Sequence, residues 1–305
     1  MSRLALRAIG PLILAAIWLS IDRDRLFGVL SRADPGWLAL AYLAPLPAIA
    51  VRTARWQILL GPAAAGWRFA ELARVYAQSI AAGVVTPGRL GEFAKAATLA
   101  RRGAGLAPAL LATILDRLAD MGFLALLGAG AWWLWVAPEQ RGGWWVGLAL
   151  GSLAAVPLLR AVAQSRAAAA LRARLLARVG DEATRADAIA PLSTRAAGLC
   201  SGATAMSWGL TFAANVLFAE SLGLPVGALE IVGISALCSL VASLPISIAG
   251  AGTRDAALIA LLAPYGVERP EALALGVLML SNTLFVGAVC ALAFLGPSVS
   301  GGSAD

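Results

Sequence analysis

Long apolar runs, separated by short segments rich in arginine, glycine and proline, dominate this chain. The longest runs cover residues 4–21, 37–60, 106–136, 144–162, 199–222 and 272–295. A helix needs about 20 apolar residues to cross a bilayer. The runs are continuous rather than alternating, which favours helices over a membrane barrel. The pattern therefore predicts an all-α, polytopic helical membrane protein.

Two further apolar runs are each interrupted by proline and glycine. The first break reads TPGRLGE at residues 86–92, and the second reads LPISIAGAG at residues 244–252, just before Arg254 and Asp255. Alignment of Glu92 with Asp255 brings the helices that follow into register without a gap, which indicates a weak internal duplication. Inside a membrane, broken helices are tolerated only where protein buries them or where they line a wet cavity.

Arginine density orients the chain, because cytoplasmic loops are enriched in basic residues. We expect both termini and the arginine-rich segment 164–198 to be cytoplasmic, and Arg52 and Arg55 to mark a cytoplasmic end of the second span. The two broken units then enter from opposite sides, which predicts two inverted repeats, each with a re-entrant helix. We divide the chain into an N-terminal membrane half, a basic amphipathic linker, a C-terminal membrane half and a disordered tail, at residues 1–163, 164–198, 199–296 and 297–305.

Composition agrees with a membrane protein and excludes several functions. Hydrophobic residues make up 60% of the 305 residues and charged residues 13%, against about a quarter in soluble domains. The net charge of +7 lies mostly in short loops, so we do not expect nucleic acid as a partner. The chain has no histidine, and its three cysteines lie unpaired in apolar runs. We therefore expect no metal site, no cofactor and no catalytic residue.

Ionisable side chains near the breaks form the candidate site. The N-terminus of a half-helix favours an anion, and an arginine fork binds phosphate through two bonds. Charges inside a bilayer are expensive, so their clustering predicts a polar site for an anionic headgroup. The predicted substrate-binding residues are Arg89, Glu92, Lys95, Asp116, Arg117, Asp120, Arg254, Asp255 and Asn282. The alternative is mutual neutralisation, with Arg89 on Glu92, Arg117 on Asp116 or Asp120, and Arg254 on Asp255.

Four motifs in a fixed order carry a resemblance to a known family. They are RTARW at 52–56, TPGRLGE at 86–92, DRLAD at 116–120 and LPISIAGAGTRD at 244–255. Together they resemble the lysylphosphatidylglycerol synthase transmembrane-region family, the flippase-like membrane module of the multiple peptide resistance factor. Members more often carry glutamate where this chain has Asp116 and Asp255, and both changes keep the charge.

The resemblance implies a flippase or transporter of lipid-linked intermediates in the cell membrane. Two-part members carry a soluble aminoacyltransferase domain after the membrane module. This chain ends too soon to hold one, so we do not expect it to aminoacylate lipid alone. Aminoacyl-phosphatidylglycerol, a polyprenyl-phosphate sugar and a hopanoid all stay open as cargo.

Two other functions compete with transport. One is a membrane-embedded transferase acting on a lipid phosphate, with Glu92, Asp116 or Asp120 as base or metal ligand. The other is an accessory subunit of a separate membrane glycosyltransferase. We expect a transporter rather than an enzyme. Its expected partners are a membrane lipid substrate and anionic headgroups at the cytoplasmic surface, and a separate lipid-modifying enzyme or a homodimer stays open.

Overall fold

The structure is a computed structural model, and it describes residues 23–136, 193–243 and 250–295. Helices form these segments and no strand occurs within them, which confirms the all-α prediction there. The α-helices are α2 (Arg23–Ser31), α3 (Pro35–Leu43), α4 (Leu46–Leu60), α5 (Phe69–Val84), α6 (Ala94–Leu99), α7 (Leu106–Val136), α11 (Thr194–Ser221), α12 (Ala228–Ala242), α13 (Thr253–Leu262) and α14 (Arg269–Ala291). Short 3-10 or π turns join them at η1 (Gly61–Ala64), η2 (Pro87–Phe93), η3 (Ala100–Ala104), η5 (Ala263–Tyr265) and η6 (Leu292–Phe294).

Two stretches are long and apolar enough to cross a membrane by length and composition, Pro35–Ala64 and Arg269–Phe294. Helices α7 and α11 are also long, with 31 and 28 residues. The sequence predicted more crossings, and the multi-pass topology stays a prediction. Helix α11 begins at Thr194, inside the predicted linker 164–198. The rest of that linker, to residue 192, and the predicted tail 297–305 lie outside the described residues, and the division into domains stays a prediction.

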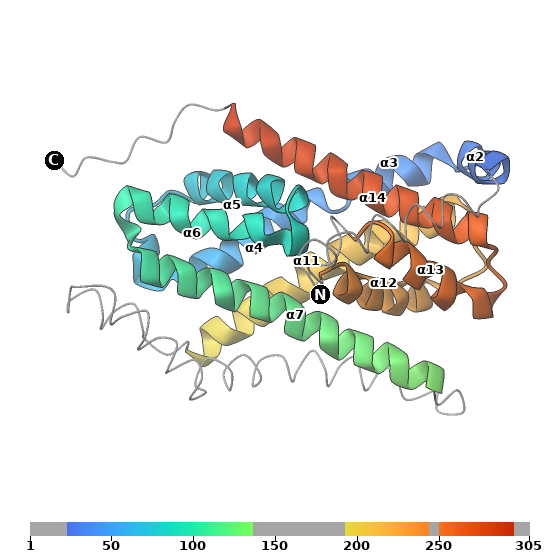
Figure 1. Ribbon diagram of the computed structural model, residues 1–305. Helices are drawn as coiled ribbons and strands as arrows, with labels where there is room; N and C mark the ends of the chain where they lie inside the picture. Colours follow the sequence, from blue (N-terminus) through green and yellow to red (C-terminus); the bar gives the residue numbers. More distant parts are fainter. Residues whose placement is uncertain (1–22, 137–192, 244–249, 296–305) are drawn as a thin grey trace, which may run out of the picture.

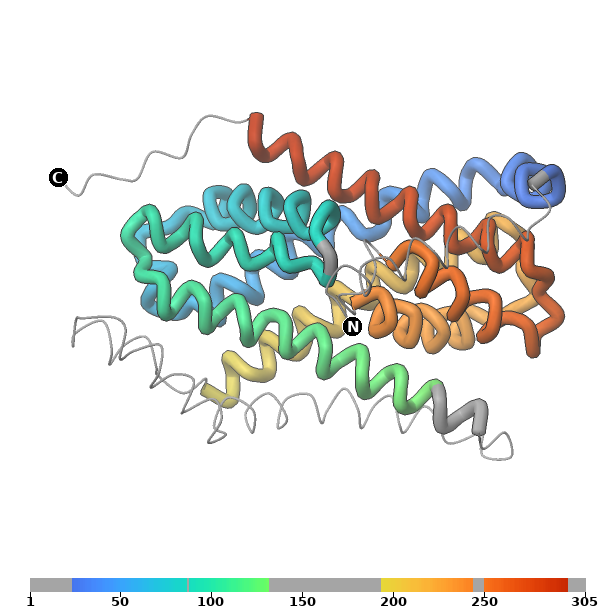
Figure 2. Tube along the Cα trace, in the orientation of Figure 1, coloured from blue at the N-terminus to red at the C-terminus, as the bar shows by residue number. Residues whose placement is uncertain are grey.

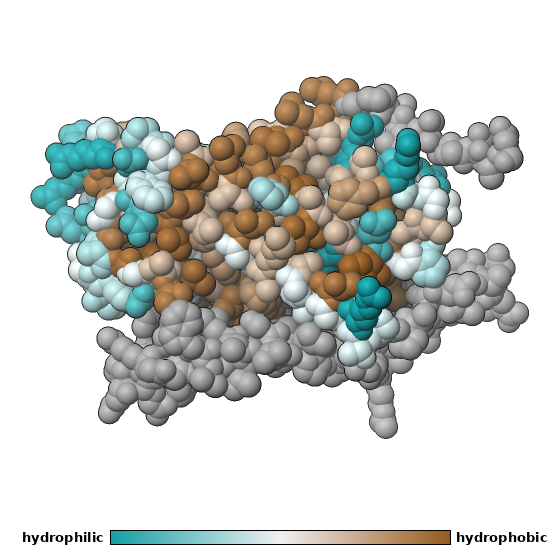
Figure 3. Space-filling view, turned by 180° about the vertical axis from the view of Figure 1, so that it is seen from behind, coloured by the Kyte–Doolittle hydropathy of each residue, from teal (hydrophilic) through white to brown (hydrophobic). Residues whose placement is uncertain are grey.

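One face of the molecule is apolar in its middle and polar towards its two ends. In Figure 3, hydrophilic residues gather towards two opposite ends and hydrophobic residues cover most of the middle. The long helices α7 and α14 run between these ends (Figure 1). Large apolar side chains are exposed on α3, α11 and α14, among them Leu40, Leu43, Met206, Leu284 and Phe285. An apolar surface of this kind suits contact with lipid.

Two buried hydrophobic clusters organise the interior. The first includes Trp56, Tyr76 and Leu99 and joins α4, α5, α6 and the start of α7. The second includes Phe218 and Leu258 and joins α11, α12, α13 and α14. Each cluster therefore anchors one helical hairpin, α5–α6 in the first and α12–α13 in the second.

The first hairpin turns at the predicted break. Helix α5 ends at Val84, and the chain reverses through η2, where Gly88 and Arg89 have left-handed φ angles of 59° and 57°. The amide of Gly91 donates to the hydroxyl of Thr86 at 2.7 Å. A Cβ at Gly91 would collide with the backbone of the α5 terminus at Ala82. Glycine is therefore required for the two arms to approach this closely.

The second hairpin has a similar build. Helix α12 ends at Ala242, and α13 begins at Thr253, where the sequence predicted a new helix. Gly250 has a φ of 79°, and a Cβ there would lie 2.5 Å from the Cβ of Ala242. The predicted break at 245–252 is described only from Gly250 onward, because residues 244–249 lie outside the described residues.

The turn η2 of the first hairpin lies in the middle of the molecule, and so do the end of α12 and the start of α13 (Figure 2). Helices α5 and α6 reach this middle from one end, and α12 and α13 reach it from the other (Figure 1). This arrangement brings Arg89 of the first break and Arg254, just after the second, to the wall of one cavity. The inverted-repeat relation and the re-entrant position in a membrane stay predictions.

Candidate functional site

A buried network of charged side chains joins α4, the first hairpin and α7. At its centre, the fully buried Arg55 on α4 contacts Asp116 (Nη2 to Oδ1, 2.6 Å) and Asp120 (Nη1 to Oδ1, 2.7 Å). Its Nη1 also donates to the hydroxyl of Thr204 on α11 at 2.7 Å. A charge this deep is tolerated only when it is paired and hydrogen-bonded. Arg55 therefore ties α4 to α7 and α11.

Lys95 on α6 forms a second ion pair with Asp116. Its Nζ lies 2.5 Å from Asp116 Oδ2, and the hydroxyl of Tyr76 donates to the same oxygen at 2.9 Å. The ammonium also lies 3.9 Å from the centroid of the Tyr76 ring and 5.2 Å from that of Trp56. Cation–π contacts of this kind strengthen when water is excluded. The only lysine of the chain is thus fixed between a carboxylate and two aromatic faces.

Arg117 extends the network towards the hairpin turn. Its guanidinium lies 2.9 Å from Glu92 and 2.7 Å from Asp120. Glu92 also pairs with Arg89, at 3.3 Å between Oε1 and Nε. The pairs Arg89–Glu92 and Arg117–Asp120, expected under mutual neutralisation, are therefore present. Four cations against three carboxylates leave an excess of one positive charge in this network.

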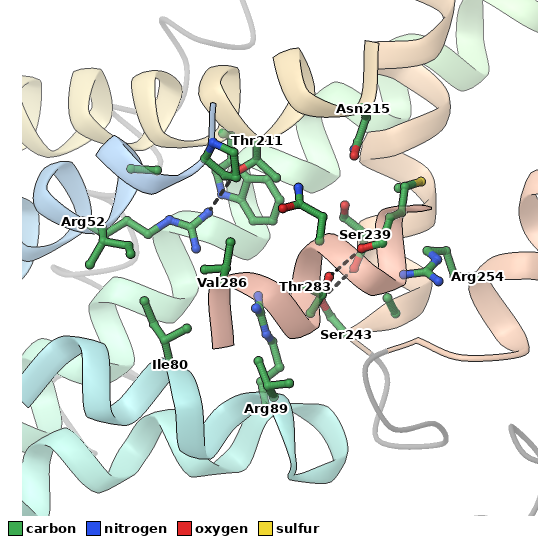
Figure 4. Close-up of a pocket in the computed structure, with 18 residues that line it drawn as sticks. Arg52, Ile80, Arg89, Thr211, Asn215, Ser239, Ser243, Arg254, Thr283 and Val286 are labelled. Carbon is green, nitrogen blue, oxygen red and sulfur yellow. Dashed lines mark hydrogen bonds between the residues drawn. The ribbon is translucent and has the colours of Figure 1, made fainter. Parts of the chain in front are cut away.

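A cavity of about 150 Å³ lies beside this network, between the two hydrophobic clusters. Arg52, Arg89 and Arg254 line it from α4, η2 and α13 (Figure 4). No carboxylate occurs among the described residues of its wall. The other polar lining residues are Thr211, Asn215, Ser239, Ser243, Asn282 and Thr283, with Trp208 as the aromatic one. The cavity is therefore cationic and rich in neutral hydrogen-bonding groups.

Several polar atoms at the cavity lack a partner. Arg52 Nε, Arg254 Nε and Asn282 Oδ1 are buried and make no hydrogen bond to any described residue. Their residues are 9%, 4% and 7% exposed. An unsatisfied buried polar group costs free energy, and more so when it is charged. These atoms point to a ligand or water that completes their bonding.

Arg52 is placed by the aromatic wall. Its guanidinium lies 5.1 Å from the centroid of the Trp208 ring, and its Nη2 donates to Thr211 at 3.4 Å. No described acidic residue forms an ion pair with it. Its charge is therefore available to an anion in the cavity.

Arg254 is held by the second hairpin and α14. Its Nη2 donates to the carbonyl of Gly276 at 2.9 Å and lies 3.1 Å from Asp255 Oδ1. Asp255 in turn accepts a bond from the amide of Gly252 at 2.9 Å, which caps α13. These bonds use one end of the guanidinium and leave Nε without a partner.

Arg89 reaches the cavity from a strained backbone. Among the described residues, it is the only non-glycine residue with positive φ. This conformation costs about 1–3 kcal/mol and persists only where surrounding structure imposes it. Its side chain is 32% exposed and shares Glu92 with Arg117. The strained turn aims one arginine of the first hairpin into the cavity (Figure 4).

The nine residues predicted for the site divide into two groups. Arg89, Arg254 and Asn282 line the cavity, and Asp255 pairs with one of them. The other five belong to the ion-pair network, namely Glu92, Lys95, Asp116, Arg117 and Asp120. Both sets come from the breaks and the helices that follow them.

Arg52 and Arg55 are functional candidates that were not among the residues predicted for the site. The sequence placed both at a cytoplasmic end of a span, which stays a prediction. The structure shows that both are buried, with Arg52 9% exposed and Arg55 completely buried. Their spacing of three residues puts both on one face of α4, beside Trp56. A pair of arginines inside an apolar run was the available signal, because such residues mark polar sites in membrane helices.

The family described as lysylphosphatidylglycerol synthase TM region matches residues 5–291 of the chain. No curated protein and no solved structure matched the chain.

Proposed function

Because the chain belongs to the lysylphosphatidylglycerol synthase TM region family of membrane proteins, with a lipid-related function, we propose that it transfers lipids with anionic headgroups between leaflets. In this proposal, Arg52, Arg89 and Arg254 hold the phosphate of the headgroup in the central cavity. The observation that carries it is the convergence of three arginines on a cavity whose described wall has no carboxylate.

The unpartnered atoms support phosphate as the ligand. Arg52 and Arg254 each keep a free Nε in a buried position. A guanidinium that binds phosphate through two parallel bonds uses Nε together with a terminal nitrogen. The phosphate would therefore complete bonding that the described protein groups leave unfinished.

The location of the cavity supports transfer rather than binding at one surface. It is lined by Arg89 of η2 and by Arg254 at the start of α13, and both elements reach the middle of the molecule (Figure 2). On the face seen in Figure 3, hydrophobic residues cover this middle. A headgroup held there is halfway between the polar ends, and its acyl chains could remain in lipid. Helix breaks that meet at a midplane site are typical of transporters.

In this proposal, the acidic residues beside the cavity orient its arginines and do not contact the lipid. Glu92 and Asp255 orient Arg89 and Arg254 through ion pairs. Glu92 has a second cationic partner in Arg117, so Arg89 can turn towards phosphate without leaving Glu92 unpaired. The network thus stabilises the protein with the cavity empty or occupied.

The test is headgroup exposure of labelled phosphatidylglycerol in vesicles that contain the purified protein. Arg52→Gln, Arg89→Gln and Arg254→Gln should each lower the transfer rate by more than about tenfold, because loss of one partner of a buried charge pair costs about 2–5 kcal/mol. The control is Arg25→Gln, at an exposed ion pair with Glu268, which should transfer normally.

Normal transfer by all three cavity variants would refute the proposal. Mass spectrometry of the lipid after the assay separates transport from chemistry. Unchanged lipid supports transport, whereas a modified headgroup would favour the transferase.

A further inference from the structure

The cavity wall also limits the kind of headgroup that fits. Its described charged residues are three arginines, and segment 244–249, which adjoins Ser243 of the wall, has no ionisable residue. Three acids contact residues of the wall, namely Glu92, Asp120 and Asp255, and each is already paired with arginine. A cationic substituent on a headgroup would meet three like charges and no free carboxylate.

The remaining polar groups of the wall are neutral. Two asparagines and four hydroxyl residues surround the arginines, and Asn282 Oδ1 lacks a hydrogen-bond donor. An unpaired amide oxygen accepts a bond from a hydroxyl group of a ligand. The hydroxyls of Thr211, Ser243 and Thr283 donate to carbonyls of their own helices, and their oxygens can still accept bonds from the hydroxyls of glycerol, inositol or a sugar. A ligand without hydroxyls would leave Asn282 Oδ1 unpaired, which costs free energy.

From this wall we propose that the cavity selects phosphate headgroups that carry hydroxyls and no positive charge, and that it discriminates against aminoacylated ones. This inference rests on the proposed function, because it specifies the substrate class of the same cavity. The volume of about 150 Å³ agrees with a phosphate and a small polyol part, since one water needs about 10–15 Å³.

Electrostatics sets the size of the discrimination. Lysyl-phosphatidylglycerol carries two ammonium groups against one phosphate, whereas phosphatidylglycerol is a simple anion with a glycerol headgroup. An ammonium in a partly desolvated site lined by arginines has unfavourable Coulomb energy and no counter-ion. We expect phosphatidylglycerol to be bound more than about tenfold more tightly.

The experiment is native mass spectrometry of the full chain in detergent, with equal amounts of phosphatidylglycerol and lysyl-phosphatidylglycerol of the same acyl chains. Retention of phosphatidylglycerol by more than about tenfold supports the inference. Equal retention, or a preference for the lysyl lipid, overturns it. Inorganic phosphate is added in a separate arm. Displacement of phosphatidylglycerol at matched phosphate concentration would mean that the site binds free phosphate, which also overturns the inference.

A variant that gains affinity for the lysyl lipid gives the most direct test. Asn282→Asp puts a carboxylate of the same shape into the wall, so the preference should shift towards the lysyl lipid by about tenfold or more. The matched control is Ser193→Asp, which adds the same charge at an exposed helix cap where aspartate is equally suited. An unchanged ratio in folded Asn282→Asp protein overturns the inference.

Failure of the proposed function can be told apart from failure of this inference. Selective binding without transfer in vesicles refutes only the transport proposal. Equal transfer of both lipids refutes only the selectivity.

Discussion

Asp116 accepts short bonds from three side chains of the buried network, and loss of its negative charge should destabilise the protein strongly. In Asp116→Asn the shape is kept and one negative charge is lost. Arg55 Nε, Lys95 Nζ and the Tyr76 hydroxyl all bond to this carboxylate, at 2.8, 2.5 and 2.9 Å. The change would raise the excess of positive charge in the network from one to two.

The magnitude follows from breaking buried ion pairs. Removing one partner of such a pair costs about 3–5 kcal/mol, because the other charge is left without compensation. Three bonds are weakened together, so their individual contributions do not add. With an unfolding entropy of about 2.1 cal/mol/K per residue, each kcal/mol lowers the unfolding temperature of a 305-residue chain by about 1.5 °C. We expect Asp116→Asn to unfold at least about 4 °C below the wild type.

The assay is thermal unfolding of purified protein in detergent, with a double variant as control. Asp116→Asn with Lys95→Met restores the original charge balance and removes the ammonium that lost its partner. The double variant should recover at least half of the lost stability. The reasoning is refuted if Asp116→Asn unfolds within about 2 °C of the wild type, or if Lys95→Met adds a full second loss.

Three further predictions concern the hairpin and the orientation. Arg89→Gly relieves the left-handed backbone at φ 57° and leaves Glu92 paired with Arg117, so it should unfold within about 2 °C of the wild type while lipid transfer is lost; retained transfer would contradict the assigned role. Gly91→Ala would push a methyl group into the α5 backbone and should cost about 1–3 kcal/mol, whereas Gly209→Ala, with open space around it, should be neutral or stabilising by up to about 1 kcal/mol, both measured by thermal unfolding. Single-cysteine labelling in a cysteine-free background should place segment 164–198 in the cytoplasm, and external labelling would contradict the inverted orientation of the two units.

Much of the local structure was predictable from short-range patterns. The end of α5 near residue 85 and the start of α13 at Thr253 followed from proline, glycine and the charged residues after them. These boundaries are decided by backbone groups within a few residues, so the sequence contains the whole cause. The resemblance to the family rested on the same motifs, and the family match confirms it.

The roles of the charged residues were less predictable. The sequence treated Arg89, Lys95 and Asp116 as members of one site, and the structure assigns them to a cavity wall and to an ion-pair network beside it. The sequence placed Arg52 and Arg55 at a cytoplasmic end of the second span, where arginines are common, and gave no sign that they are buried. The burial of Arg55 depends on Asp116, which lies 61 residues further along the chain. The burial of Arg52 depends on Trp208 and Thr211 of α11, which are more distant still in the chain.

The amino-acid sequence alone determined that the chain is helical, that it belongs in a membrane, and that two breaks interrupt its helices. These properties follow from the composition and spacing of residues within each segment, and they do not depend on which distant segments pack against it. Only the tertiary structure decided which charges neutralise one another and which stay available to a ligand. That distinction depends on distances of about 3 Å between helices, and packing sets such distances after every helix has formed.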